Sequence, residues 1–155
     1  GLVPSAAQPV LVIENWARAL KTDGLLFLTH FGLDTLAEIT GYLKTRNIAV
    51  ASPFADMHDL GDMLFHHGFY DPVMDTAKLE LSYTRAETFW QDMDTFGIWA
   101  ALQFADEADA RAAVNEGFAQ GLLHTVTLET VYGHAVKKLQ MPENENVVQF
   151  YPRRR

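Results

Sequence analysis

The chain has 155 residues, of which 48% are hydrophobic, and its formal net charge is −8. This composition is typical of one globular domain with its own core. The acidic balance argues against a general nucleic-acid binder, which needs a basic surface. The absence of cysteine excludes disulfides and thiolate metal sites. No apolar run is long enough to cross a bilayer and no leader with a cleavage site is visible, so we expect a cytoplasmic protein with no membrane contact.

The first half of the chain is predicted to alternate helix and strand. Apolar residues at helical spacing predict a helix over 9–20. The unbroken apolar run after it predicts a strand over 25–29, of the kind that is buried on both faces of an α/β sheet. Helices over 34–42 and 56–64 follow, the first capped by Asp34, with a loop over 45–55 between them.

The second half adds strands and two further helices. Residues 69–72 are predicted to form a turn, and residues 73–74 and 79–83 two short strands. Helices are predicted over 84–96 and 105–118, and a long β-type run over 122–136. We also expect an exposed apolar stripe, which would mark a protein-binding surface, at Phe89, Trp90, Phe96 and Trp99.

This order of elements predicts an α/β fold that is incomplete as a sheet. The strand over 25–29 has no obvious parallel partner, and no Gly-rich turn between a strand and a helix occurs in the sequence. Ligands of open α/β sheets bind beyond the carboxyl ends of the strands. Thr29, His30 and Phe31 are therefore expected to face whatever the protein binds.

Several phrases of the sequence resemble a known enzyme family. The segment 16–28 is similar to the helix-then-strand phrase of class I S-adenosylmethionine-dependent methyltransferases. Downstream, Met-His-Asp-Leu-Gly at 57–61 and Tyr-Gly-His-Ala at 132–135 resemble the malonyl-acyl-carrier-protein O-methyltransferases of biotin synthesis. The resemblance runs from about residue 8 to 138 and covers only the C-terminal half of that family.

The resemblance implies a partial class I methyltransferase, or Rossmann-like, sheet. Residues 1–155 would form a single domain containing strands 5, 6 and 7 of the family, of which the last, over 123–136, is antiparallel. Segments of about 33–55 and 85–121 would be lid helices over the substrate. The cofactor would be S-adenosylmethionine, but the family's cofactor-binding turn has no counterpart here. Whether the chain is an enzyme by itself is therefore left open, and we expect the isolated chain to be inactive.

The resemblance also assigns site residues. No residue is expected to be catalytic, because a carboxylate is already a nucleophile and methyl transfer to it depends on positioning. His30 would bind the malonyl carboxylate, and departs from the small hydroxyl residue usual at that place; Thr29 would contact the cofactor. The residues expected to bind substrate are His30, Phe31, Phe54, Met57 and His58. The alternatives are a half-buried histidine bonded to backbone for His30, a cap or packing residue for His58, and core packing for the other three.

We expect no metal site in this chain. His58 and Asp62 share a helical face, but no third ligand has a fitting spacing, and His66 and His67 would point to different sides. An acyl-carrier-protein-linked substrate would dock on basic residues, namely Lys44, Arg46, Lys137, Lys138 and Arg153 to Arg155. We expect a homo-oligomer that forms through an exposed sheet edge or the lid helices. The alternative function is a non-catalytic protein-interaction or assembly module derived from a methyltransferase.

Overall fold

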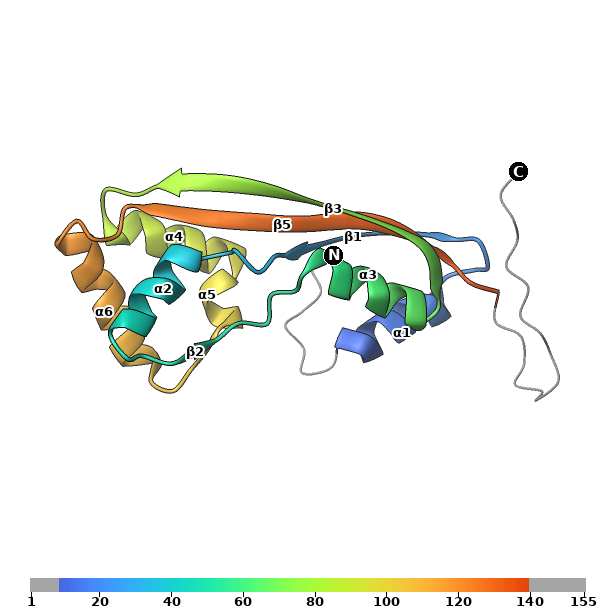
Figure 1. Cartoon of the computed structure of the whole chain (residues 1–155), viewed down its shortest axis with the longest axis horizontal. Coiled ribbons are helices and arrows are strands. Elements are labelled where there is room, and N and C mark those ends of the chain that lie inside the picture. The colour runs from blue at the N-terminus through green and yellow to red at the C-terminus, as the bar shows by residue number, and fades with distance from the viewer. Residues whose placement is uncertain (1–8, 140–155) are drawn as a thin grey trace. The chain divides into compact units, whose positions relative to one another are not determined.

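The computed structural model describes residues 9–139, which fall into two compact units (Figure 1). Unit 1 contains the described residues 9–29, 57–75 and 132–139. Unit 2 contains residues 30–56 and 76–131. Each unit is described by itself below.

Helices and strands alternate along the chain, as expected for an α/β protein, except that α5 follows α4 directly. The helices are α1 (Pro9–Ala19), α2 (Ala37–Thr45), α3 (Met57–His66), α4 (Ala86–Phe96), α5 (Ile98–Ala101) and α6 (Glu107–Ala119). The strands are β1 (Leu25–Phe31), β2 (Val50–Ala51), β3 (Phe69–Ser82), β4 (Gln103–Phe104) and β5 (Thr125–Lys137).

The three long strands pair in the order β1-β5-β3, and β2 pairs with β4 in a separate antiparallel ribbon. Backbone bonds show that β1 and β5 are antiparallel, because Lys137 N–H donates to Gly24 and Gly32 N–H donates to Glu129. The orientation agrees with the antiparallel strand that the resemblance implied for 123–136. Within residues 9–139, β1 has β5 as its one neighbour.

Strand β3 corrects the prediction for residues 69–83. The turn expected at 69–72 and the two short strands expected after it are one continuous strand. Pro72 lacks an N–H and suggested a turn, but β3 lies at the edge of the three-stranded sheet. An edge strand has one side that needs no hydrogen-bond donor, so proline is tolerated there.

In unit 1, α1 and α3 contact each other and lie on the same side of the strands (Figure 1). The residues that form the unit's buried core are Ile13, Ala17, Leu28, Leu60, Leu64, Phe69, Ala135 and Val136. The expectation that β1 is buried on both faces is wrong for the described residues, since Leu25 is 54% and Phe27 is 67% exposed. Helices cover one face of β1 and leave these side chains on the other.

Unit 2 packs α2, α4, α5 and α6 around a core rich in aromatic rings. Phe89 is fully buried, with its ring centroid 5.5 Å from that of Tyr83 and 5.2 Å from that of Phe118. Trp99 is 4% exposed, and its indole N–H donates to Glu107 at 2.9 Å. The expected exposed apolar stripe is therefore wrong for Phe89 and Trp99, whereas Phe96 is 47% exposed.

The start of α2 also differs from the prediction. Asp34 does not cap the helix; the N-cap position is Leu36, in a left-handed conformation with a φ of 60°. Leu36 N–H donates to the carbonyl oxygen of Thr127 at 2.8 Å, and the carboxylate of Glu38 accepts from Thr127 N–H at 2.9 Å. Hydrogen bonds to β5 thus fix the start of α2 in place of a side-chain cap.

Sequence reasoning missed the short elements β2, α5 and β4, which are too brief to show a period. None of the helices formed by residues 9–139 combines the length and hydropathy of a membrane span.

Candidate functional site

The six predicted site residues divide between the units. His30, Phe31 and Phe54 belong to unit 2, whereas Thr29, Met57 and His58 belong to unit 1.

His30 is the buried polar residue of β1, with 7% of its surface exposed. Its ring donates to the backbone carbonyl of Pro53, while Nδ1 is buried without a hydrogen-bond partner. The donor is therefore Nε2. Burial lowers the pKa of His30 below the ordinary value of 6.5, and the hydrogen bond to Pro53 opposes this shift only in part. The ring is neutral at pH 7, so Nδ1 carries a lone pair and can accept a hydrogen bond but cannot donate one.

The contact with a malonyl carboxylate that we expected for His30 stays a prediction, which the hydrogen bonding of the ring limits. A carboxylate needs a donor or a cation, and the one N–H of the neutral His30 ring is already bonded to Pro53. The group that Nδ1 can bind is an N–H or O–H donor. The alternative of a histidine with a backbone partner describes the observed hydrogen bond, but it leaves Nδ1 unsatisfied.

Phe31 and Phe54 pack edge to face beside this histidine, with ring centroids 5.9 Å apart. Ala55 N–H donates to the carbonyl oxygen of Phe31 at 3.3 Å, which holds the loop after β2 against the end of β1. Phe54 is 6% exposed and belongs to the hydrophobic core of unit 2, and Phe31 packs on that core. Both rings therefore pack at the core of unit 2, and a contact of either ring with substrate stays a prediction.

In unit 1, Thr29 lines an apolar cavity of about 410 Å³ on the strands. The residues that line it are Phe27, Leu28, Thr29, Tyr132, Gly133 and His134. The ring of Phe27 contacts that of His134 across the β1–β5 pair, at 5.7 Å between centroids. Met57 and His58 form the first turn of α3, where Met57 is half-buried and His58 exposed.

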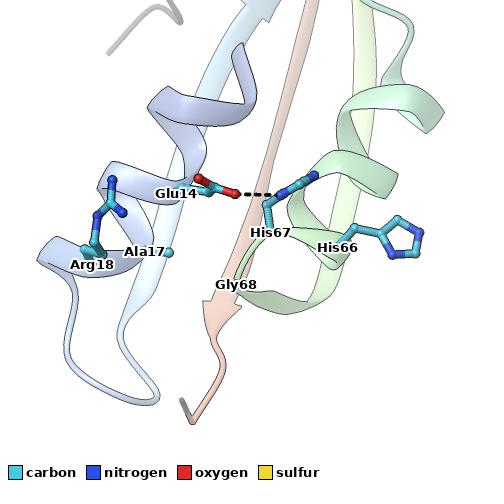
Figure 2. Close-up of a pocket in the computed structure, with 6 residues that line it drawn as sticks. All are labelled: Glu14, Ala17, Arg18, His66, His67 and Gly68. Carbon is cyan, nitrogen blue, oxygen red and sulfur yellow. Dashed lines mark hydrogen bonds and ion pairs between the residues drawn. The ribbon is translucent and has the colours of Figure 1, made fainter. Parts of the chain in front are cut away.

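A polar pocket of about 440 Å³ lies between α1 and the end of α3 (Figure 2). His67 Nδ1 is 3.1 Å from a carboxylate oxygen of Glu14, and the two rings of His66 and His67 point in different directions, as expected. The ring of His66 points away from Glu14 (Figure 2). Nothing in the sequence pattern predicted the Glu14–His67 pair, whose members are 53 positions apart.

The described residues offer no cluster for a metal. Within 9–139, no three His, Asp or Glu side chains gather closely enough to hold an ion. Glu14 and His67 supply two ligand atoms, whereas a protein metal site normally has three or more.

Of the four basic candidates that the structure describes, three make polar contacts within the protein. Lys137 is buried, and its Nζ donates to the carbonyl oxygens of Ala17 and Leu20. Lys138 donates to the carbonyl oxygen of Phe65, and burial lowers the pKa of this lysine. Both ammonium groups are therefore already hydrogen-bonded within unit 1.

The remaining basic candidates are Arg46, Lys44 and the terminal arginines. Arg46 forms an ion pair with Glu116. Lys44 is exposed and lines a groove of about 520 Å³ along α2, together with Leu33 and Ile48. Arg153 to Arg155 lie outside the described residues.

Comparison with known proteins gives malonyl-[acyl-carrier protein] O-methyltransferases as sequence relatives. The chain is 34% identical to a malonyl-[acyl-carrier protein] O-methyltransferase of Methylovorus sp., over 88% of this chain and 50% of that protein. Enzymes of the same name from Laribacter hongkongensis and Gallionella capsiferriformans are 29% and 38% identical, over 93% and 77% of this chain. No family model matches.

Among solved structures, a Haemonchus contortus phospholethanolamine N-methyltransferase 2, in complex with phosphomonomethylethanolamine and S-adenosylhomocysteine, is similar at a TM-score of 0.42. That similarity has 17% sequence identity and covers 87% of this chain and 31% of the other. The chain spans about half the length of the curated relatives it matches. Over most of its own length it therefore resembles one half of a malonyl-[acyl-carrier protein] O-methyltransferase.

Proposed function

We propose that this chain is the substrate-side, C-terminal half of an S-adenosylmethionine-dependent methyltransferase that O-methylates the free carboxylate of malonyl-acyl-carrier protein in biotin synthesis. The observation that carries the proposal is the run of relatives with that enzyme name, at 29–38% identity over 77–93% of this chain. The strand order β1-β5-β3 supports it, because β5 would then be the antiparallel seventh strand between strands five and six. We also retain the cytoplasmic location as part of the proposal.

In this proposal unit 2 is the lid. Its residues 30–56 and 76–131 include both segments that the resemblance assigned to lid helices. His30, Phe31 and Phe54 are its substrate contacts, and the unbonded Nδ1 of His30 accepts a hydrogen bond from an N–H or O–H group of the substrate. Met57, His58 and Thr29 remain proposed contacts in unit 1.

The residues present do not fit the cofactor by themselves. The cavity beside Thr29 has no carboxylate among its lining residues that could hold the hydroxyl groups of a ribose. The sequence also lacks the Gly-rich strand-to-helix turn by which such folds bind nucleotides. The proposal therefore assigns S-adenosylmethionine mainly to the part of the enzyme that this chain does not match, and the 155-residue chain alone is inactive.

The alternative of a non-catalytic binding module stays open; of the stripe that favoured it, Phe89 and Trp99 are buried and Phe96 is 47% exposed. Self-association remains part of the proposal. The edge strand β1, whose one neighbour within residues 9–139 is β5, would pair with a second copy when the chain is alone.

A chimera tests the proposed function. The 150 matched residues of the Methylovorus enzyme are replaced by this chain, and transfer of a labelled methyl group to malonyl-acyl-carrier protein is measured. We expect methylation by the chimera, and calorimetry of the 155-residue chain alone should give no micromolar binding of S-adenosylmethionine. A chimera that binds the cofactor but does not methylate would contradict the function.

The proposed role of His30 is tested in the same chimera. His30→Leu removes the acceptor, whereas His30→Asn restores a side-chain oxygen on the same strand. The KM for the carrier substrate should rise with His30→Leu and recover in part with His30→Asn. Equal KM values for the two variants and the parent would remove His30 from the substrate contacts.

A further inference from the structure

A groove of about 520 Å³ follows α2 in unit 2, where α2 and β2 are neighbours (Figure 1). We call it the α2 groove. Its first wall includes Ala37, Gly41 and Lys44, which are three or four positions apart and therefore share one face of the helix. Its second wall is the segment 48–50, which leads into β2. The volume falls within the range of about 300–1,000 Å³ that small-molecule sites occupy.

Gly41 keeps the middle of this groove open. Glycine is unfavourable inside a helix, because the unfolded chain loses more conformational freedom at glycine than at other residues. Apart from the backbone of α2 and its chain neighbours, no atom of the described residues lies within 4 Å of a Cβ built on Gly41. Packing within this part of the chain therefore does not require the glycine. The missing side chain leaves room for a molecule that approaches the helix closely.

Lys44 places a positive charge at one end of the groove. Its side chain is exposed, and within residues 9–139 its ammonium group has no ion pair or hydrogen bond. Arg46, by contrast, is paired with Glu116. Every other residue that lines the groove is uncharged, from Leu33 to Val50. This lining fits an elongated, mainly uncharged ligand that carries one anionic group at its end.

The second wall runs back along α2 toward the end of β1. Ile48 N–H donates to the carbonyl oxygen of Leu43 at 3.0 Å, which turns the chain back after the helix. Ala55 N–H donates to the carbonyl oxygen of Phe31 at 3.3 Å, which brings the same segment to the residue after His30. The groove is thus built between a cation at the end of α2 and the residues proposed to contact the substrate.

We propose that the α2 groove holds the phosphopantetheine arm of the acyl-carrier-protein substrate, with the phosphodiester beside Lys44 and the thioester-bound malonyl group toward His30. An acyl carrier holds its acyl group on such an arm, a long and mainly uncharged chain whose anionic phosphodiester joins it to the protein. The arm therefore matches a groove that is uncharged except at one end. This inference rests on the proposed function for the identity of the substrate.

Titration of the 155-residue chain with phosphopantetheine, followed by NMR of the backbone amides, tests the inference. We expect saturable shifts at residues 37–44 and 48–50. Pantetheine, which lacks the phosphate, should bind about three- to fivefold more weakly, because an exposed ion pair contributes modestly. This difference should disappear at 1 M salt, where the Debye length is about 3 Å.

Two variants separate the cation from the space. Lys44→Met should abolish the preference for phosphopantetheine over pantetheine. Lys21→Met, which changes an exposed lysine of unit 1, is the matched control and should keep that preference. Gly41→Leu fills the groove and should weaken the binding of both compounds by about tenfold or more. Its thermal midpoint should not fall, because leucine favours a helix and the space around the position is open.

The absence of shifts at residues 37–44 in millimolar phosphopantetheine would overturn the inference. Equal shifts with inorganic phosphate alone would also overturn it, by reducing the site to an adventitious ion only. A methylating chimera whose KM for the carrier substrate is unchanged by Gly41→Leu would leave the function standing and this inference contradicted. A chain that binds the arm, in a chimera that does not methylate, would contradict the function and leave the groove assignment standing.

Discussion

The ammonium group of Lys137 donates a hydrogen bond to the carbonyl oxygen of Ala17, and a second to that of Leu20 at 3.1 Å. A buried cation thus closes the carboxyl end of α1, where unpaired carbonyl groups concentrate partial negative charge. The contact joins the last residue of β5 to a helix that lies 120 positions earlier in the chain.

Lys137→Met should therefore destabilise the protein. It keeps much of the side-chain length but leaves two carbonyl groups without their donor, and we expect the free energy of unfolding in urea to fall by about 1–3 kcal/mol. Lys78→Met is the control, because Lys78 pairs with Asp34 on the surface and exposed pairs contribute little. A midpoint for Lys137→Met as high as that of the parent would contradict this role.

The two phenylalanines of α4 should respond oppositely to truncation. Phe89 is fully buried among Tyr83 and Phe118, so Phe89→Ala leaves a cavity and should cost about 3–5 kcal/mol. Phe96→Ala, at 47% exposure on the same helix, should change stability by less than about 1 kcal/mol. Chemical denaturation measures the stability of both variants. Similar losses of stability would contradict the burial of Phe89 in the core.

His30 should make stability depend on pH. Burial lowers its pKa in the folded state, so between that value and the ordinary 6.5 the unfolded chain binds more protons than the folded chain. The free energy of unfolding should consequently fall as the pH drops below about 6.5. In His30→Phe this dependence should weaken, whereas in the exposed-site control His66→Gln it should remain. Identical pH profiles for His30→Phe and the parent would exclude His30 as the source.

Two glycines should give changes of opposite sign when replaced by alanine. Gly68 ends α3 with a φ of 110°, and an added Cβ would lie 2.7 Å from that of Ala17, so Gly68→Ala should cost more than about 1 kcal/mol. Gly41 lies within α2 with open space around an added Cβ, and Gly41→Ala should stabilise by about 0.5–1 kcal/mol. Thermal melts of both variants check the pair. Destabilisation by Gly41→Ala would contradict a helical, sterically open position for Gly41 in α2.

The sequence by itself determined the features that depend on neighbouring residues. Helical spacing located α1, α3, α4 and α6, and Gly97 ends α4 in the left-handed conformation that glycine adopts readily. The apolar run over 25–28 located β1. The phrases at 57–61 and 132–135 led to the enzyme family whose name the relatives bear.

Only the tertiary structure decided which distant groups meet. The tautomer of His30 depends on the carbonyl of Pro53, and the burial of Lys137 depends on the register of β5 beside α1. The one-sided cover of β1 depends on where α1 and α3 pack. Spacing along a chain encodes which side of an element is apolar, but it does not encode which other element covers that side. That is why the strand was predicted correctly and its exposed face, carrying Phe27, was not.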